Sequence, residues 1–140
     1  MLNAVIIDDE RHCIETLVWK LNEYCSSVKI LGQFQKSIEA IDFIKKTPNI
    51  DILFMDIEMP NINGFEMLKF IDTHNVKIVL TTAYEKYALD ALKMHVYDYL
   101  LKPIDQLELI KLVTNIEHEH DLRKLPVNAK KVISISTQES

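Results

Sequence analysis

The amino-acid sequence predicts an α/β fold, in which one parallel β-sheet is covered by helices on both faces. Short apolar runs alternate with amphipathic segments five times, which is the pattern of repeated strand–helix units. One run, 52–55, is apolar at every position, as expected for a strand that is buried on both faces. Only two glycines occur in the 140 residues, so a glycine-rich phosphate-binding loop is excluded.

The composition fits one globular domain. The sequence is 48% hydrophobic and 26% charged and has a net charge of -5, which disfavours nucleic-acid binding by this segment itself. No apolar run is long enough to span a membrane and no basic leader precedes the first one, so we expect a cytoplasmic protein without a membrane partner. Cys13 and Cys25 lack metal-ligand spacing, and we expect two reduced thiols.

The first half of the chain contains three expected strands, at residues 2–7, 28–34 and 51–56. A helix is expected at 11–25, because its apolar side chains recur at the spacing of one helical face. These side chains are Ile14, Leu17, Val18 and Leu21. Ser37 is expected to cap the N-terminus of a second helix, which Pro48 closes.

The second half continues the alternation. A helix is expected to begin at Gly64 and to carry Phe65, Leu68 and Ile71. A strand at 76–80 then leads to Thr81 and Thr82. A short helix at 86–94 and a strand at 96–101 follow. Asp105 and Glu108 have the spacing of a capping pair. They precede a final helix that is expected to reach Arg123.

Five strand–helix units with right-handed crossovers favour the strand order 2-1-3-4-5, which is the flavodoxin-like (βα)5 three-layer sandwich. In this order the second strand is added on one side of the first strand, and the third and later strands are added on the other side. Open α/β sheets bind their ligands at this switch point, between the first and third strands. We therefore expect Asp8, Asp9 and Asp56 to meet in one crevice. Thr82 and Lys102 are expected at the same rim, because they follow the fourth and fifth strands.

This crevice has the chemistry of a metal-assisted phosphoryl site. Three crowded carboxylates need a counter-ion, and a set of oxygen ligands without His or Cys suits Mg²⁺ or Mn²⁺. A lysine and a hydroxyl could bind phosphate oxygens, and an aspartate such as Asp56 can attack phosphorus to give an acyl phosphate. The alternative is a structural ion-pair cluster of Asp8, Asp9 and Asp56 with Lys102.

Four motifs at these strand ends together resemble the receiver domain of two-component response regulators. They are Asp8-Asp9-Glu10, Met55-Asp56-Ile57-Glu58-Met59-Pro60 with Gly64, Thr82-Ala83, and Tyr99-Leu100-Leu101-Lys102-Pro103. The resemblance covers residues 1–123. It implies that Asp56 accepts a phosphoryl group from a histidine kinase. It also implies a metal site made by Asp8, Asp9, Asp56 and the backbone carbonyl of Glu58.

The same resemblance implies roles for the other motif residues. Thr82 and Lys102 would bind the phosphoryl oxygens, with Ala83 next to Thr82 in the same motif. Tyr99 would be an aromatic switch that turns inward when Thr82 moves. The structural turn residues are Pro60, Gly64 and Pro103, and the Lys102–Pro103 peptide bond is expected to be cis.

Three further segments narrow the resemblance to receivers that precede a LytTR-type DNA-binding domain. They are Thr81-Thr82-Ala83-Tyr84, Tyr87-Ala88-Leu89-Asp90-Ala91-Leu92, and Tyr97-Asp98-Tyr99-Leu100-Leu101-Lys102-Pro103-Ile104. Residues 124–140 would then be a linker and the first strand of that domain, and the alternative is a frayed tail. The implied protein is a transcription regulator that binds DNA through its missing domain. It would form a homodimer through its fourth helix, fifth strand and fifth helix.

The competing function is a haloacid-dehalogenase-like phosphatase, which also uses an aspartate nucleophile, Mg²⁺ and a lysine. Such enzymes usually carry a second aspartate two residues after the nucleophile, where this chain has Glu58. No segment that could cap a substrate is visible. We therefore expect a phosphoacceptor switch that catalyses at most its own phosphorylation and dephosphorylation.

Overall fold

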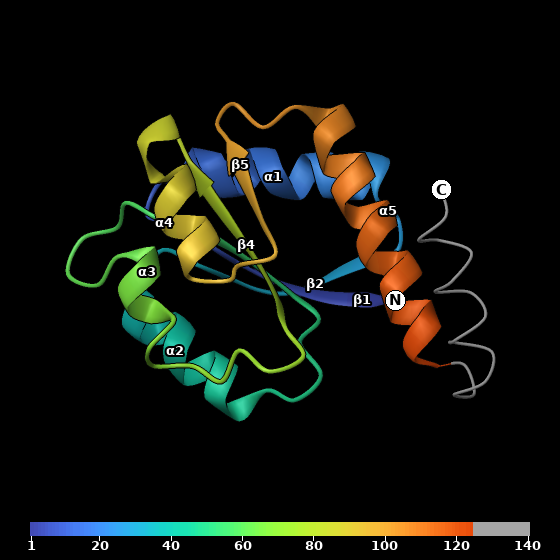
Figure 1. The fold of residues 1–140 in the computed structure, drawn as a ribbon, viewed down its shortest axis with the longest axis horizontal. Coiled ribbons are helices and arrows are strands. Elements are labelled where there is room, and N and C mark those ends of the chain that lie inside the picture. The colour runs from blue at the N-terminus through green and yellow to red at the C-terminus, as the bar shows by residue number, and fades with distance from the viewer. Residues whose placement is uncertain (125–140) are drawn as a thin grey trace.

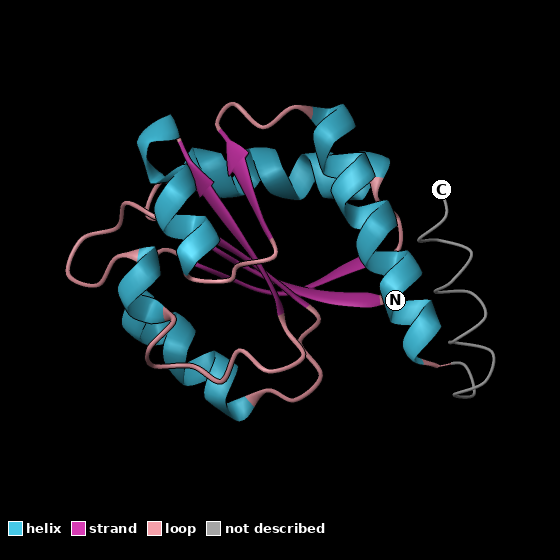
Figure 2. Ribbon diagram, viewed as in Figure 1, coloured by secondary structure: helices cyan, strands magenta, loops and turns pink. Residues whose placement is uncertain are grey.

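The computed structural model describes residues 1–124, which form alternating strands and helices (Figures 1 and 2). In chain order the elements are β1 (Leu2–Ile7), α1 (Arg11–Tyr24), β2 (Val28–Phe34), α2 (Ser37–Lys46), β3 (Ile52–Asp56), α3 (Gly64–Met67), β4 (Lys77–Thr82), the 3₁₀ turn η1 (Glu85–Tyr87), α4 (Ala88–Lys93), β5 (Asp98–Leu101) and α5 (Gln106–Arg123). None of the helices in this part of the chain combines the length and the apolar character needed to cross a membrane.

The five strands form one parallel sheet in the order β2-β1-β3-β4-β5, which confirms the predicted topology. β1 and β3 are neighbours in the middle of the sheet, with Ile7 paired to Met55. At the next position Asp56 pairs with Thr81 of β4. The carboxyl ends of the strands therefore meet at one edge, where the predicted site residues lie.

Helices cover both faces of the sheet (Figure 1). α1 and α5 pack on one face, and α2, α3 and α4 pack on the other. β3 is buried at all five positions because its alternate side chains enter both cores. Ile52 and Phe54 join the core under α1 and α5, whereas Leu53 and Met55 join the other core. This central burial fixes the position of Asp56 at the end of the strand.

The prediction that Ser37 caps the second helix is wrong. α2 begins at Ser37 itself, and its N-cap residue Lys36 makes no side-chain cap hydrogen bond. The Ser37 hydroxyl instead donates to the carbonyl oxygen of Ile62 at 2.8 Å. This residue therefore ties the start of α2 to the loop between β3 and α3.

The helix after β3 is shorter than predicted. α3 ends at Met67, because the following N–H groups of Lys69 and Phe70 bond to residues three positions back rather than four. Leu68 and Ile71 lie outside the helix but still pack against the core. The capping pair before the final helix is confirmed, since the side chain of Asp105 accepts from the Glu108 N–H at 3.0 Å.

The remaining differences concern the ends of elements. β4 extends to Thr82, so both threonines belong to the strand, and β5 begins at Asp98. The fourth helix begins at Ala88 after the turn η1. The predicted linker and added strand at 124–140 lie outside the described residues except for Lys124.

Candidate functional site

Three carboxylates lie together at the carboxyl edge of the sheet, where β1 and β3 end. Asp8, Asp9 and Asp56 each offer one oxygen, and these oxygens lie within 4.8 Å of one another. Lys102, which follows β5, places its Nζ 2.7 Å from Asp8 Oδ2 and 3.4 Å from Asp56 Oδ1. The predicted crevice is therefore present, although its residues are far apart in the sequence.

The fold buries the two central carboxylates. Asp8 and Asp56 are each only 4% exposed, because Asp8 directly follows β1 and Asp56 ends β3, in the middle of the sheet. The backbone N–H of Glu10 donates to Asp8 Oδ1 at 2.9 Å, which fixes this side chain at the beginning of α1. Asp9 is half-buried and lies closer to solvent.

Burial and mutual repulsion shape the protonation of the site. Burial, followed by the charge of Asp8, raises the pKa of Asp56 to about 7, although the nearby Lys102 opposes the rise. Burial alone would lower the pKa of Lys102, but its hydrogen bond to Asp8 and the charges of Asp56 and Asp8 raise it above its usual range. Lys102 is therefore charged at neutral pH, whereas the carboxyl of Asp56 keeps its proton to a higher pH than an ordinary aspartate does.

One lysine faces three carboxylates, so the site retains excess negative charge. The donor set consists of carboxylate oxygens, two of them buried, which suits a small hard cation such as Mg²⁺ or Mn²⁺. The ion-pair alternative accounts for the contacts of Lys102, but it leaves the remaining repulsion without a partner. The raised pKa of Asp56 comes first from burial and then from the charge of Asp8, which Lys102 offsets only in part.

The loop after Asp56 packs tightly against the end of β3. The Gly64 N–H donates to the carbonyl oxygen of Ile57 at 2.8 Å and closes the loop. A Cβ on Gly64 would lie 2.7 Å from the backbone oxygen of Asp56, so only glycine fits there. Pro60 is exposed within this loop, and its carbonyl accepts from the Ile62 N–H at 2.9 Å.

Thr82 and Tyr99 are connected through the backbone of Tyr84. The Tyr84 N–H donates to the Thr82 hydroxyl oxygen at 3.2 Å, and the Tyr84 carbonyl accepts from the hydroxyl of Tyr99. Thr82 is fully buried, whereas the neighbouring Ala83 is exposed. The Lys102 N–H donates to the Thr82 carbonyl at 2.7 Å. The Lys102–Pro103 peptide bond is cis, as the sequence led us to expect.

Comparison with known families identifies this arrangement. A model of the response regulator receiver domain matches residues 4–114 of the chain. The chain belongs to the response regulator receiver family. Receiver domains are signalling modules, and this membership supports the receiver interpretation over the phosphatase alternative.

Curated relatives agree with the family match. The receiver is 39% identical over 132 residues to the transcriptional regulatory protein BtsR of Escherichia coli strain K12, an alignment that covers 91% of this chain and 54% of BtsR. It is also 39% identical over 121 residues to an uncharacterized response regulatory protein of Vibrio cholerae, covering 86% of this chain and 50% of that protein. The chain thus spans about half the length of these relatives.

Solved receiver structures share the fold. The response regulatory domain of protein mrkE from Klebsiella pneumoniae has a TM-score of 0.76 and 26% identity, covering 84% of this chain and 97% of that domain. The REC domain of the response regulator AraT from Geobacillus stearothermophilus has a TM-score of 0.70 and 25% identity, covering 89% and 98%.

Two features of the receiver could not be predicted from sequence patterns. The Tyr87 hydroxyl donates to Glu58 Oε1 at 2.5 Å and links the loop after β3 to η1. Glu58 was predicted to act only through its backbone. In addition, Cys13 lies against His12 and near Glu10, although spacing alone gave no sign of a shared site. The first grouping depends on how the loops fold, and the second on where α1 begins.

Proposed function

We propose that this receiver accepts a phosphoryl group on Asp56 from a sensor histidine kinase. The observation that carries the proposal is the position of the Asp56 carboxylate, which ends a central strand within reach of Lys102 and two further carboxylates. A carboxylate oxygen can attack phosphorus and form an acyl phosphate. The burial of Asp56 would partly shield that acyl phosphate from water.

We infer that a divalent cation, Mg²⁺ or Mn²⁺, is held by Asp8, Asp9, Asp56 and the backbone carbonyl of Glu58. When bound, such an ion supplies positive charge for the oxygens of the phosphoryl group. Lys102 supplies a second positive charge, with its Nζ 3.4 Å from Asp56 Oδ1. Because Lys102 now bonds to Asp8, we expect it to turn towards the phosphoryl oxygens once Asp56 is modified.

We propose that Thr82 and Tyr99 transmit the modification. We expect the Thr82 hydroxyl to turn and donate to a phosphoryl oxygen on Asp56, which would weaken its bond with the Tyr84 N–H. Movement of this backbone would release the hydroxyl of Tyr99 from the Tyr84 carbonyl. Tyr99 would then turn inward, with Ala83 allowing the strand end to shift.

We propose that the receiver regulates transcription through an output domain that follows it, of the LytTR DNA-binding type. Support comes from the motif resemblance and from relatives that are named transcriptional regulatory proteins, of which the aligned segment covers 54%. DNA would be bound by that domain, and the receiver would dimerise through α4, β5 and α5. The cytoplasm, where histidine kinases present their phosphohistidine, is the expected location.

The test is to incubate the chain with acetyl phosphate, with and without Mg²⁺, and to measure its intact mass. We expect one Mg²⁺-dependent adduct that is labile in base and absent from Asp56→Asn. Asp42→Asn is the matched control, because Asp42 is an exposed helical aspartate paired with Lys46, and it should label normally. An adduct that persists in Asp56→Asn would contradict the assignment of the phosphoacceptor. Steady turnover of small phosphate esters would favour a phosphatase instead.

A further inference from the structure

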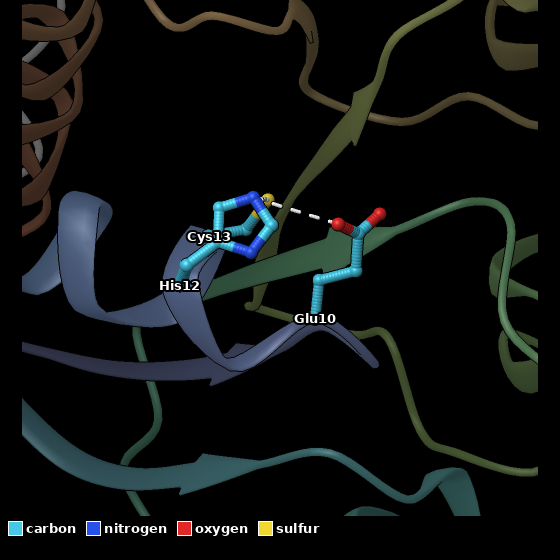
Figure 3. A group of neighbouring side chains, drawn as sticks. All are labelled: Glu10, His12 and Cys13. Carbon is cyan, nitrogen blue, oxygen red and sulfur yellow. Dashed lines mark hydrogen bonds and ion pairs between the residues drawn. The ribbon is translucent and has the colours of Figure 1, made fainter.

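Three side chains with different donor atoms converge at the first turn of α1 (Figure 3). The Nε2 atom of His12 lies 3.6 Å from the Sγ atom of Cys13 and 3.5 Å from Oε2 of Glu10. All three donor atoms lie within 4.8 Å of one another. This convergence arises because Glu10 is the N-cap residue and the other two are the second and third residues of the helix.

Two of the three separations match the edges of a tetrahedral zinc site. Nitrogen, oxygen and sulfur ligands bind Zn²⁺ at about 2.0–2.3 Å, so two ligands of one tetrahedral ion lie about 3.3–3.6 Å apart. The two separations that involve His12 are therefore already close to those of a bound site. A thiol and an imidazole are the ligands that zinc-class ions prefer, whereas the neighbouring cluster of three aspartates suits harder ions.

The surroundings leave room for an ion and its fourth ligand. Glu10, His12 and Cys13 all line one cavity of about 360 Å³, which continues past Thr16 to Lys102. The side chains of Glu10 and His12 are 57% and 75% exposed, so an ion can reach them from solvent. Cys13 is half-buried at the wall of the cavity. A water molecule in the cavity could complete four-coordination.

We propose that Glu10, His12 and Cys13 form a binding site for a zinc-class divalent cation, separate from the acidic cluster of Asp8, Asp9 and Asp56. The neutral imidazole would donate the lone pair of Nε2, and Glu10 would bind through a carboxylate oxygen. The thiol of Cys13 would lose its proton to solvent as the metal–sulfur bond forms, without any change of oxidation state.

The protein offers this thiol in protonated form. Burial and the charge of Asp8 raise the pKa of Cys13, although Lys102 opposes the rise. The thiol therefore holds its proton more firmly than an ordinary cysteine until an ion binds. The ion itself provides the positive charge that stabilises the thiolate.

The test uses Co²⁺ as a spectroscopic probe of the whole chain, in the presence of excess Mg²⁺ to occupy the acidic cluster. We expect one Co²⁺ per chain with the near-ultraviolet absorption of a thiolate-bound ion, and displacement by Zn²⁺. Cys13→Ser should abolish the absorption, and His12→Ala should weaken binding by at least about tenfold. Circular dichroism would verify that these surface variants fold.

Two controls separate this site from its alternatives. Cys25→Ala removes the other thiol, which is buried in the core, and should leave the absorption unchanged. Asp9→Asn alters the acidic cluster and should also leave Co²⁺ binding unchanged. Absorption that survives in Cys13→Ser, or no absorption in the parent chain, would overturn the proposal. Because Asp56→Asn should bind Co²⁺ normally, this result is independent of the phosphoacceptor experiment.

Discussion

The carboxyl group of Asp56 makes the stability of the metal-free receiver depend on pH. Its pKa is about 7 in the folded chain, against an ordinary value of 3.8. Between these values the folded state binds more protons than the unfolded state, so stability falls as pH rises through this window. Asp56→Asn cannot ionise, and we expect it to exceed the parent in free energy of unfolding above pH 7, on the order of 1–3 kcal/mol.

Urea unfolding in EDTA at several pH values would measure this difference. The advantage of Asp56→Asn should shrink as pH falls from about 7 towards 4, because the parent carboxyl becomes neutral. Asp42→Asn, at an exposed position, should show no comparable trend. A difference that stays constant over this range would show that Asp56 is not the group responsible.

Lys102 forms ion pairs with both Asp8 and Asp56, and only 17% of its side chain is exposed. Lys102→Met would leave these buried carboxylates without this cation. We expect the metal-free variant to lose about 3 kcal/mol of stability at pH 8. Mg²⁺ should restore part of the loss, because a bound cation can replace the missing charge.

The matched control is Lys46→Met, which removes the exposed pair with Asp42 and should cost less than about 1 kcal/mol. Thermal and urea unfolding of both variants, each with EDTA and with Mg²⁺, would measure these losses of stability. Equal losses in Lys102→Met and Lys46→Met would contradict the central electrostatic role of Lys102.

At the scale of elements, the loop between β3 and α3 depends on Gly64. A Cβ there would lie 2.7 Å from the Asp56 backbone oxygen and 3.0 Å from the Ile57 Cα, and neither backbone atom can yield without moving the strand end. We expect Gly64→Ala to destabilise the receiver by about 1–3 kcal/mol. It should also weaken Mg²⁺ binding, since the same loop carries the Glu58 carbonyl.

Gly32→Ala is the natural comparison, because it is the only other glycine of the chain. A Cβ at Gly32 would meet ring atoms of Phe34 and Phe43, which are side chains that can shift. Denaturation and Mg²⁺ titration of both variants should therefore show lower Mg²⁺ affinity for Gly64→Ala alone. If both variants bound Mg²⁺ like the parent, the loop would not position a metal ligand.

The same element shows where sequence patterns reach their limit. The strand at β3 was predictable because a short, unbroken apolar run between turn residues is typical of a strand buried on both faces. Ser37 was assigned wrongly because N-cap preference is local, whereas its actual partner, Ile62, lies 25 residues away. The end of α3 was missed because the apolar residues Leu68 and Ile71 keep helical spacing, although the backbone hydrogen bonds there reach three residues back instead of four.

For the whole molecule, the sheet order was predictable because right-handed connections leave few topologies for five repeated units. That order alone brings Asp8, Asp56 and Lys102 together. The contacts that join loops, such as Tyr87 with Glu58 and His12 with Cys13, were not predictable. They depend on loop conformations and helix starts that apolar periodicity does not encode.

The assembly of the activated receiver can be tested on α4. Leu92 is 73% exposed, so this apolar side chain contributes little to the core of the folded monomer. If α4, β5 and α5 form the proposed dimer, beryllofluoride with Mg²⁺, which mimics the phosphoryl group, should produce a dimer in sedimentation experiments. Leu92→Glu should weaken this dimer at least about tenfold, because a charge would be buried in the interface.

Ile38→Glu is the matched control for Leu92→Glu. Ile38 is 68% exposed but lies on α2, away from the proposed interface, so its replacement should leave dimer formation unchanged. Both substitutions add the same charge at an exposed apolar position, and neither should destabilise the fold by much more than about 0.5 kcal/mol. A dimer that tolerates Leu92→Glu but not Ile38→Glu would place the interface on α2, because the added charge would then be buried there.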